Sequence, residues 1–197
     1  MKTETHKLLA NYIVENYMNN QSLLRKLAFK IGTVEPDYNP FSYLRGFYAQ
    51  PFYGHNSTNC RRYILKTARK LENQGCDSVL KFFILGCFIH YLADSFTYTH
   101  NKYFRGGVKK HDMYERELHG IYLETIRSFN GDVPLQLGAA SADLPTLIKE
   151  LHTRYEIVSG QPKTDMAYIM CITCLAVKRC IKQPDSFIRK TATDLSL

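Results

Sequence analysis

A histidine and an aspartate four residues apart, His90 and Asp94, are the pair in this sequence best placed to do chemistry. They follow a mostly apolar run, Val79 to Ile89, which predicts a buried helix. Positions i and i+4 lie on one face of a helix, so both side chains can reach the same bound cation. Burying an imidazole and a carboxylate is costly unless a partner compensates them, and a metal ion is a strong partner. A core hydrogen bond between His90 and Asp94 is the alternative, and the pair alone does not separate the two.

Further histidines and carboxylates fall at the ends of expected helices or in the loops beside them. A second i,i+4 pair, His111 and Glu115, opens the helix that follows Gly106 and Gly107. The remaining candidates are His6, Asp37, His55 and His100. Imidazole and carboxylate ligands without a thiolate suit zinc or another borderline divalent ion. These eight side chains are too many for one tetrahedral site, so they predict a cluster of two or three metal ions.

The elements that must position these residues are predicted to be helices. Apolar periodicity and capping residues predict helices over Thr5–Tyr17, Ser22–Lys30, Ser57–Asn73, Asp77–Thr97, Lys110–Phe129, Asp143–Val158 and Thr164–Ile181. No segment shows a convincing alternation of strand type. We therefore expect an all-α fold, a single-domain multi-helix bundle over residues 1–197 that surrounds a buried multi-zinc site, with a poorly ordered tail at 183–197.

One long irregular stretch is expected between the helices, from Gly32 to His55, with Asp37 early in it. It contains three prolines and is dense in tyrosine and phenylalanine, from Tyr38 to Tyr53. A loop of this length in a compact domain is more often functional than idle. The aromatic side chains either line a substrate pocket or cover the end of the bundle.

Composition limits the choice of partners and compartment. A net charge of +8 and a pI of about 9.1 favour anionic partners such as phosphate esters, membrane surfaces or nucleic acid. The charges are scattered, so a solvated surface is a simpler interpretation than a nucleic-acid face. The apolar run near residue 79 is too interrupted to span a membrane. The first residues lack the apolar stretch of a signal peptide, so we expect a cytoplasmic protein unless an upstream segment has been removed.

The six cysteines carry little functional signal. Cys171 and Cys174 form a CxxC, but they lie in an apolar helical stretch and no second CxxC exists. We interpret them as reduced core residues rather than as a metal or redox site. His119 and His152 match no motif and are interpreted as surface or satisfied core residues. Tyr91 and Phe96 are interpreted as core.

The order of the candidate ligands resembles that of a known family. Along the chain it reads His6, Asp37, His55, His90-x3-Asp94, His100 and His111-x3-Glu115. This resembles the ligand pattern of the zinc-dependent phospholipase C family, whose fold is shared more distantly with a group of zinc-dependent nucleases. The segment from Gly86 to Asp94, and the step of six residues from Asp94 to His100, also resemble the family's core motif. The resemblance covers about Met1 to Glu115.

The resemblance implies which side chains hold which ion. One zinc would be held by Asp37, His55, His90 and Asp94. A second would be held by His100, His111 and Glu115. Asp94 would bridge to a third zinc, shared with His6 and a terminal α-amine. Asp37 could also orient or deprotonate the attacking water, a catalytic role that the sequence does not separate from metal binding.

The terminal ligand is where this chain departs from the family pattern. The family uses an N-terminal tryptophan, and this sequence has no Trp. Met1 is our candidate instead, because the large Lys2 should leave the initiator methionine in place. If the amine were blocked, Glu4 could substitute.

The implied activity is hydrolysis of a phospholipid head-group phosphodiester by zinc-activated hydroxide, with transient contact to a membrane surface. Glu115 favours the phospholipase branch, since the nuclease branch tends to aspartate there. A nuclease or nucleotidase on the same site is one alternative. A zinc-binding helical protein without catalytic activity is the other.

Overall fold

Seven α-helices form the fold in this computed structural model, which describes residues 1–44, 56–128 and 142–181. They are α1 (Thr3–Tyr17), α2 (Leu23–Tyr38), α3 (Ser57–Gln74), α4 (Val79–Ser95), α5 (Val108–Ser128), α6 (Leu144–Val158) and α7 (Pro162–Cys180). Two short 3-10 turns, η1 (Pro40–Leu44) and η2 (Tyr98–His100), connect them. No strand occurs in these ranges, so the all-α prediction is confirmed. His55, most of the aromatic stretch and the tail at 183–197 lie outside the described residues.

Capping residues explain why the helices begin and end where they do. The side chains of Ser22, Asn56, Ser78 and Asp143 each accept a hydrogen bond from the backbone N–H three residues ahead. Gly75 ends α3 with a φ of 70°, which a residue without a Cβ adopts without strain.

The predicted start of the first helix was two residues late. α1 begins at Thr3, and Lys2 precedes it without a side-chain capping hydrogen bond. Thr5 therefore lies inside the first turn, where its buried hydroxyl lies 2.8 Å from Nδ1 of His119. His119 is thus satisfied within the protein, as predicted.

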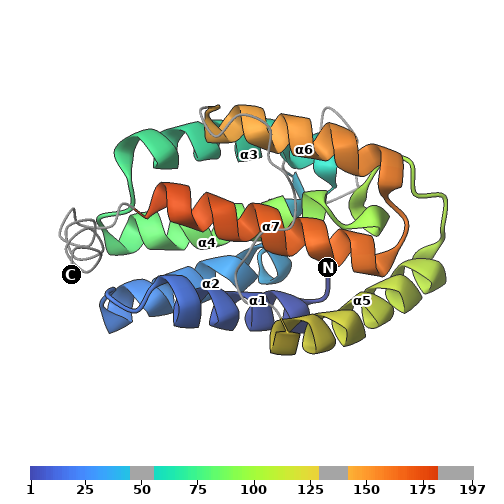
Figure 1. Cartoon of the computed structure of the whole chain (residues 1–197), viewed down its shortest axis with the longest axis horizontal. Coiled ribbons are helices and arrows are strands. Elements are labelled where there is room, and N and C mark those ends of the chain that lie inside the picture. Colours follow the sequence, from blue (N-terminus) through green and yellow to red (C-terminus); the bar gives the residue numbers. More distant parts are fainter. Residues whose placement is uncertain (45–55, 129–141, 182–197) are drawn as a thin grey trace, which may run out of the picture.

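The helices form three layers (Figure 1). α4 and α7 lie side by side in the central layer, with α3 and α6 on one side and α1, α2 and α5 on the other. α4 has apolar residues around its whole circumference and is buried from Leu85 to Ser95. A helix apolar on all sides belongs inside a protein, which is where α4 lies. None of the helices in the described ranges is long and apolar enough to cross a membrane.

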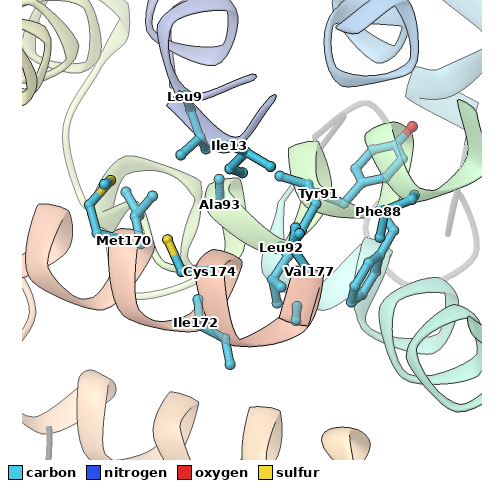
Figure 2. Close-up of a cluster of buried hydrophobic side chains, with 14 of the residues drawn as sticks. Leu9, Ile13, Phe88, Tyr91, Leu92, Ala93, Met170, Ile172, Cys174 and Val177 are labelled. Atoms are coloured by element: carbon cyan, nitrogen blue, oxygen red, sulfur yellow. The ribbon is translucent and has the colours of Figure 1, made fainter. Parts of the chain in front are cut away.

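The core forms where α1, α4 and α7 meet. Figure 2 shows Leu9 and Ile13 of α1 beside Ala93 of α4 and Cys174 of α7. All four side chains are fully or almost fully buried. Tyr91 and Phe96 are also core residues, as predicted from the sequence. This packing fixes α4 at the centre, so side chains on its other face have a rigid support.

α2 is longer than predicted. The irregular stretch was expected to begin at Gly32, and this expectation was wrong. The helix continues through Gly32 and Pro36 to Tyr38, so Asp37 lies in its last turn rather than in a loop. Gly32 is a contact point rather than a stop signal. A Cβ built there would lie 2.1 Å from the carbonyl oxygen of Phe83, so only glycine permits this approach of α2 to α4.

Gly86 is the matching contact on α4, and Gly86→Ala is expected to destabilise the protein. Its Cβ would lie 2.2 Å from the carbonyl oxygen of Phe29, and backbone cannot move aside as a flexible side chain can. We expect a loss of at least about 2 kcal/mol in the free energy of unfolding, measured by thermal or denaturant melting. Gly120→Ala is the control, because its Cβ would meet nothing within 4 Å and alanine favours the helix. Equal melting temperatures for the two variants would contradict this view of the α2–α4 contact.

Candidate metal centre

Seven of the eight candidate side-chain ligands lie in the described residues, and five elements carry them. They are His6 on α1, Asp37 on α2, His90 and Asp94 on α4, His100 on η2, and His111 and Glu115 on α5. The eighth, His55, lies outside the described residues. The structure brings six of these seven residues, from sequence positions up to 109 residues apart, into two adjoining groups, and Asp37 lies beside the first.

The first group is His6, His90 and Asp94, all of them almost completely buried. Nε2 of His6 lies 3.1 Å from Oδ1 of Asp94, and Nε2 of His90 lies 3.3 Å from its Oδ2. The two imidazole rings stack at 3.9 Å between centroids. One ligand atom from each residue lies within 4.8 Å of the other two, which is the spacing of donors around a single ion.

The hydrogen bond of His90 fixes which ring nitrogen faces this group. Nδ1 of His90 lies 2.9 Å from the carbonyl oxygen of Thr33 on α2. A carbonyl only accepts, so Nδ1 carries the hydrogen and donates it. In the neutral ring, Nε2 then presents its lone pair toward the carboxylates of Asp94 and Asp37. A metal ion between them would satisfy these acceptors together, and a backbone carbonyl behind a ligating histidine is a common support for a metal site.

The second group is His100, His111 and Glu115. Oε1 of Glu115 lies 2.9 Å from Nε2 of His100 and 3.0 Å from Nε2 of His111. His111 and Glu115 are one turn apart on α5, as their spacing predicted. This group is partly exposed, with 38% of the His111 side chain accessible, so it is the side of the centre open to solvent.

The α-amine of Met1 joins the two groups. It lies 2.8 Å from Oδ1 of Asp94, 2.9 Å from Oε1 of Glu115 and 2.7 Å from Nε2 of His100. The amine is completely buried. Lys2 helps to hold this end of the chain in place, since its Nζ forms an ion pair with Asp112 of α5 at 3.0 Å.

Asp37 approaches the first group from α2. Its Oδ1 lies 3.6 Å from Nε2 of His90, and its Oδ2 accepts a hydrogen bond of 2.7 Å from the hydroxyl of Thr3. The Thr3 hydroxyl therefore orients the carboxylate so that Oδ1 faces His90. Thr3 and Thr33 are supporting residues that the sequence analysis missed, because neither a threonine hydroxyl nor a backbone carbonyl stands out in a search for ligand side chains.

The pKa shifts of three ligand side chains, His6, Asp94 and Glu115, favour the forms that bind a metal ion. Burial, with the neighbouring His90, lowers the pKa of His6 to about 4, so its ring is neutral near pH 7. Burial opposes ionisation of Asp94, but His100, the α-amine and His90 hold its pKa well below its usual range. The pKa of Glu115 is also lowered despite burial, chiefly by the α-amine and His100. Burial likewise lowers the pKa of the Met1 amine, yet Asp94 and Glu115 raise it to about 10, so a metal ion must displace a proton to bind there.

The residues fit a zinc centre. Nδ1 of His6 and Oδ2 of Asp94 are buried without a hydrogen-bond partner in the described part of the chain. Oδ2 of Asp94 faces ring nitrogens of both His90 and His100, at 3.3 and 3.6 Å, so an ion bound between them would satisfy it. The donors are imidazole nitrogens and carboxylate oxygens, the set that zinc accepts.

Asp165 is a supporting residue that the sequence did not predict. It connects α7 to the two segments that carry His100 and Glu115. This buried carboxylate of α7 accepts hydrogen bonds from the backbone N–H of Tyr98 and the hydroxyls of Tyr114 and Tyr155, at 2.7, 2.7 and 2.8 Å. Tyr98 is two residues before His100, and Tyr114 directly precedes Glu115. Asp165 therefore restrains both segments relative to α7. Burial raises its pKa to about 6 against the effect of these hydrogen bonds.

The CxxC cysteines are separate from the centre. Cys171 and Cys174 are fully buried, as predicted, and burial raises the pKa of Cys171 to about 12. A thiol with a raised pKa is a poor metal ligand because the thiolate is the binding form. Cys171→Ser is therefore expected to leave zinc per chain unchanged, as measured by atomic emission on the purified protein. A lower zinc content in a variant that remains folded would show that the thiol takes part.

Comparison with known protein families identifies the family of this chain. The family described as zinc dependent phospholipase C matches residues 5–156, which is more than half of the 197 residues and includes all eight candidate side-chain ligands. The comparison with curated proteins gives no match, and neither does the comparison with solved structures. The helical fold, the order of the ligand residues and this match agree, and the chain belongs to the zinc-dependent phospholipase C family.

Proposed function

We propose that this protein hydrolyses the head-group phosphodiester of a phospholipid at a centre of two or three zinc ions. The observation that carries the proposal is the convergence of two His/carboxylate groups on Asp94 and the α-amine of Met1. Family membership supports a phospholipid as substrate and zinc as the metal.

Each ligand has a proposed place. His90, Asp94 and Asp37 would hold one ion, to which the family resemblance adds His55, outside the described residues. His100, His111 and Glu115 would hold a second. His6, Asp94 and the Met1 amine would hold a third. Asp94 is thus the residue proposed to touch two ions, and its two oxygens contact different histidines, His6 through Oδ1 and His90 through Oδ2.

Zinc, when bound, lowers the pKa of a water molecule and stabilises negative charge on phosphate oxygens. The protein's own contribution is positioning. Asp37, oriented by Thr3, is proposed to orient the attacking water or accept its proton, in addition to binding metal. Partly exposed His111 and Glu115 leave access for a substrate phosphate, and the chain's net charge of +8 favours an anionic ligand.

A substrate panel tests the activity. The zinc-loaded protein is expected to release the phosphorylated head group from phosphatidylcholine or another phospholipid, and chelation of the metal should abolish the release. Bis-p-nitrophenyl phosphate reports general phosphodiesterase activity, and single-stranded DNA reports the nuclease alternative, which the basic charge permits. Cleavage of DNA but no phospholipid would replace the lipid proposal with the nuclease one. No chelator-sensitive cleavage of any substrate would leave a zinc-binding protein without this activity.

A further inference from the structure

One face of α2 exposes apolar side chains to solvent. Leu23, Leu24, Leu27 and Ile31 are between 49% and 80% exposed. The last three follow Leu23 by one, four and eight residues, and this spacing places all four on one stripe of the helix. We call these four residues the α2 stripe. Single exposed leucines are ordinary on a protein surface, but a continuous stripe of them marks an interaction site.

The stripe does not belong to the core. The opposite face of α2 buries Ala28, Phe29, Gly32 and Thr33. Phe29 and Gly32 lie on the side that approaches the backbone of α4. α2 therefore has two apolar faces, of which the fold uses one. A helix that only needs to cover the core carries polar residues on its other face.

The stripe leads toward the metal centre. Tyr38 and Phe41 follow at the end of α2 and in η1, and they are 67% and 75% exposed. They lie on either side of Asn39 and Pro40, directly after Asp37. A partner with an apolar surface that binds along α2 would therefore also reach the last turn of the helix, which carries the candidate ligand Asp37.

The charged residues of α2 alongside the stripe are positive, and its two acidic residues, Glu35 and Asp37, lie beyond Ile31. The first twelve residues of α2, Leu23 to Val34, include Arg25, Lys26 and Lys30 and no acidic residue. In helical projection Lys26 and Lys30 lie beside Leu23 and Leu27. Apolar side chains bordered by lysines are the composition of helices that lie in the interface of a phospholipid bilayer.

We propose that the α2 stripe docks this protein on the surface of a phospholipid bilayer, with Lys26 and Lys30 at the level of the phosphates. This inference rests on the proposed phospholipid substrate. A second copy of the chain is a poorer occupant. In a symmetric dimer through this face, Lys26 and Lys30 of both copies would be buried together without an acidic partner from the same stretch.

Docking is tested by replacing stripe residues with glutamine, which keeps helix propensity. In Leu23→Gln/Leu27→Gln, cosedimentation of the zinc-loaded protein with phosphatidylcholine vesicles and hydrolysis of those vesicles are expected to fall at least about tenfold. Hydrolysis of a short-chain phospholipid dissolved below its micelle concentration is expected to change less than about twofold, because that substrate needs no docking. The control Ile157→Gln/Val158→Gln removes two exposed apolar residues of α6, in the opposite layer, and should behave as the wild type.

The lysines give an independent measure. Addition of an anionic lipid should strengthen vesicle binding, and Lys26→Gln/Lys30→Gln should weaken that gain by about fivefold per lysine. Equal vesicle binding by the stripe variant and the α6 control would overturn the proposal. So would a wild-type dimer in solution that the stripe substitutions dissociate, since it would assign this face to a second copy. The two proposals can fail separately. If the wild type and the control bind vesicles, the stripe variant does not, and none of the three cleaves a substrate, docking through the α2 stripe is supported and the proposed activity is not.

Discussion

Asp94→Asn is expected to lose more zinc than His6→Ala and to lose at least about 100-fold in phosphodiesterase activity. Asparagine has nearly the shape of aspartate, but it lacks the charge and offers only one oxygen. Asp94 contacts His6 and the α-amine through Oδ1, and His90 and His100 through Oδ2. Removing its charge therefore weakens both groups, whereas His6→Ala is expected to lose about one ion from the two or three of the wild type.

The same substitution should destabilise the protein. Without the carboxylate, the buried α-amine and imidazoles lose the negative charge at their centre, and breaking a buried ion pair in this way costs about 3–5 kcal/mol. For a chain of this size we expect the melting temperature to fall by about 10 °C. Asp77→Asn is the control, because Asp77 is 72% exposed in its ion pair with Lys81 and its substitution should leave the melting temperature nearly unchanged. Full zinc content in Asp94→Asn would disprove the bridging role.

Extension of the chain ahead of Met1 is expected to remove about one zinc per chain and most of the activity. The Met1 nitrogen is completely buried within 2.9 Å of Asp94, His100 and Glu115, and an amide nitrogen in its place can neither ligate a metal nor carry a charge.

A fusion that a protease cuts directly before Met1 provides the control for the extension. The uncut protein should be low in zinc and activity, and cleavage followed by zinc addition should restore both, since the α-amine is then free. The same extra residues placed after Leu197 should have no effect. Normal zinc content in the uncut fusion would show that another group, such as Glu4, completes the site.

The residue types and their spacing determined much of the fold. The i,i+4 pairs His90–Asp94 and His111–Glu115 lie on single helix faces as predicted, because helical periodicity is a local property of the chain. The bounds of α3 and α4 were predicted to within two residues for the same reason: their capping residues act on backbone groups only three or four positions away.

α2 shows where such local signals mislead. Gly32 and Pro36 predicted the end of a helix, yet the helix continues to Tyr38. The close approach of Gly32 to the backbone of α4 stabilises this segment from outside, and tertiary contacts of that kind override local propensity. Asp37 thereby became a helical residue with a fixed direction toward His90.

The sequence by itself thus determined the helices, the order of the candidate ligands and the family that they resemble. Only the tertiary structure decided which donors meet: the Met1 amine between Asp94 and Glu115, Thr33 behind His90, and Asp165 behind the segments of His100 and Glu115. The contacts of the Met1 amine and of Thr33 join positions 57 to 114 residues apart in the sequence, and those of Asp165 join positions 51 to 67 residues apart. No local pattern encodes such distances, because they depend on how α4 packs between its neighbours rather than on the propensity of any one segment.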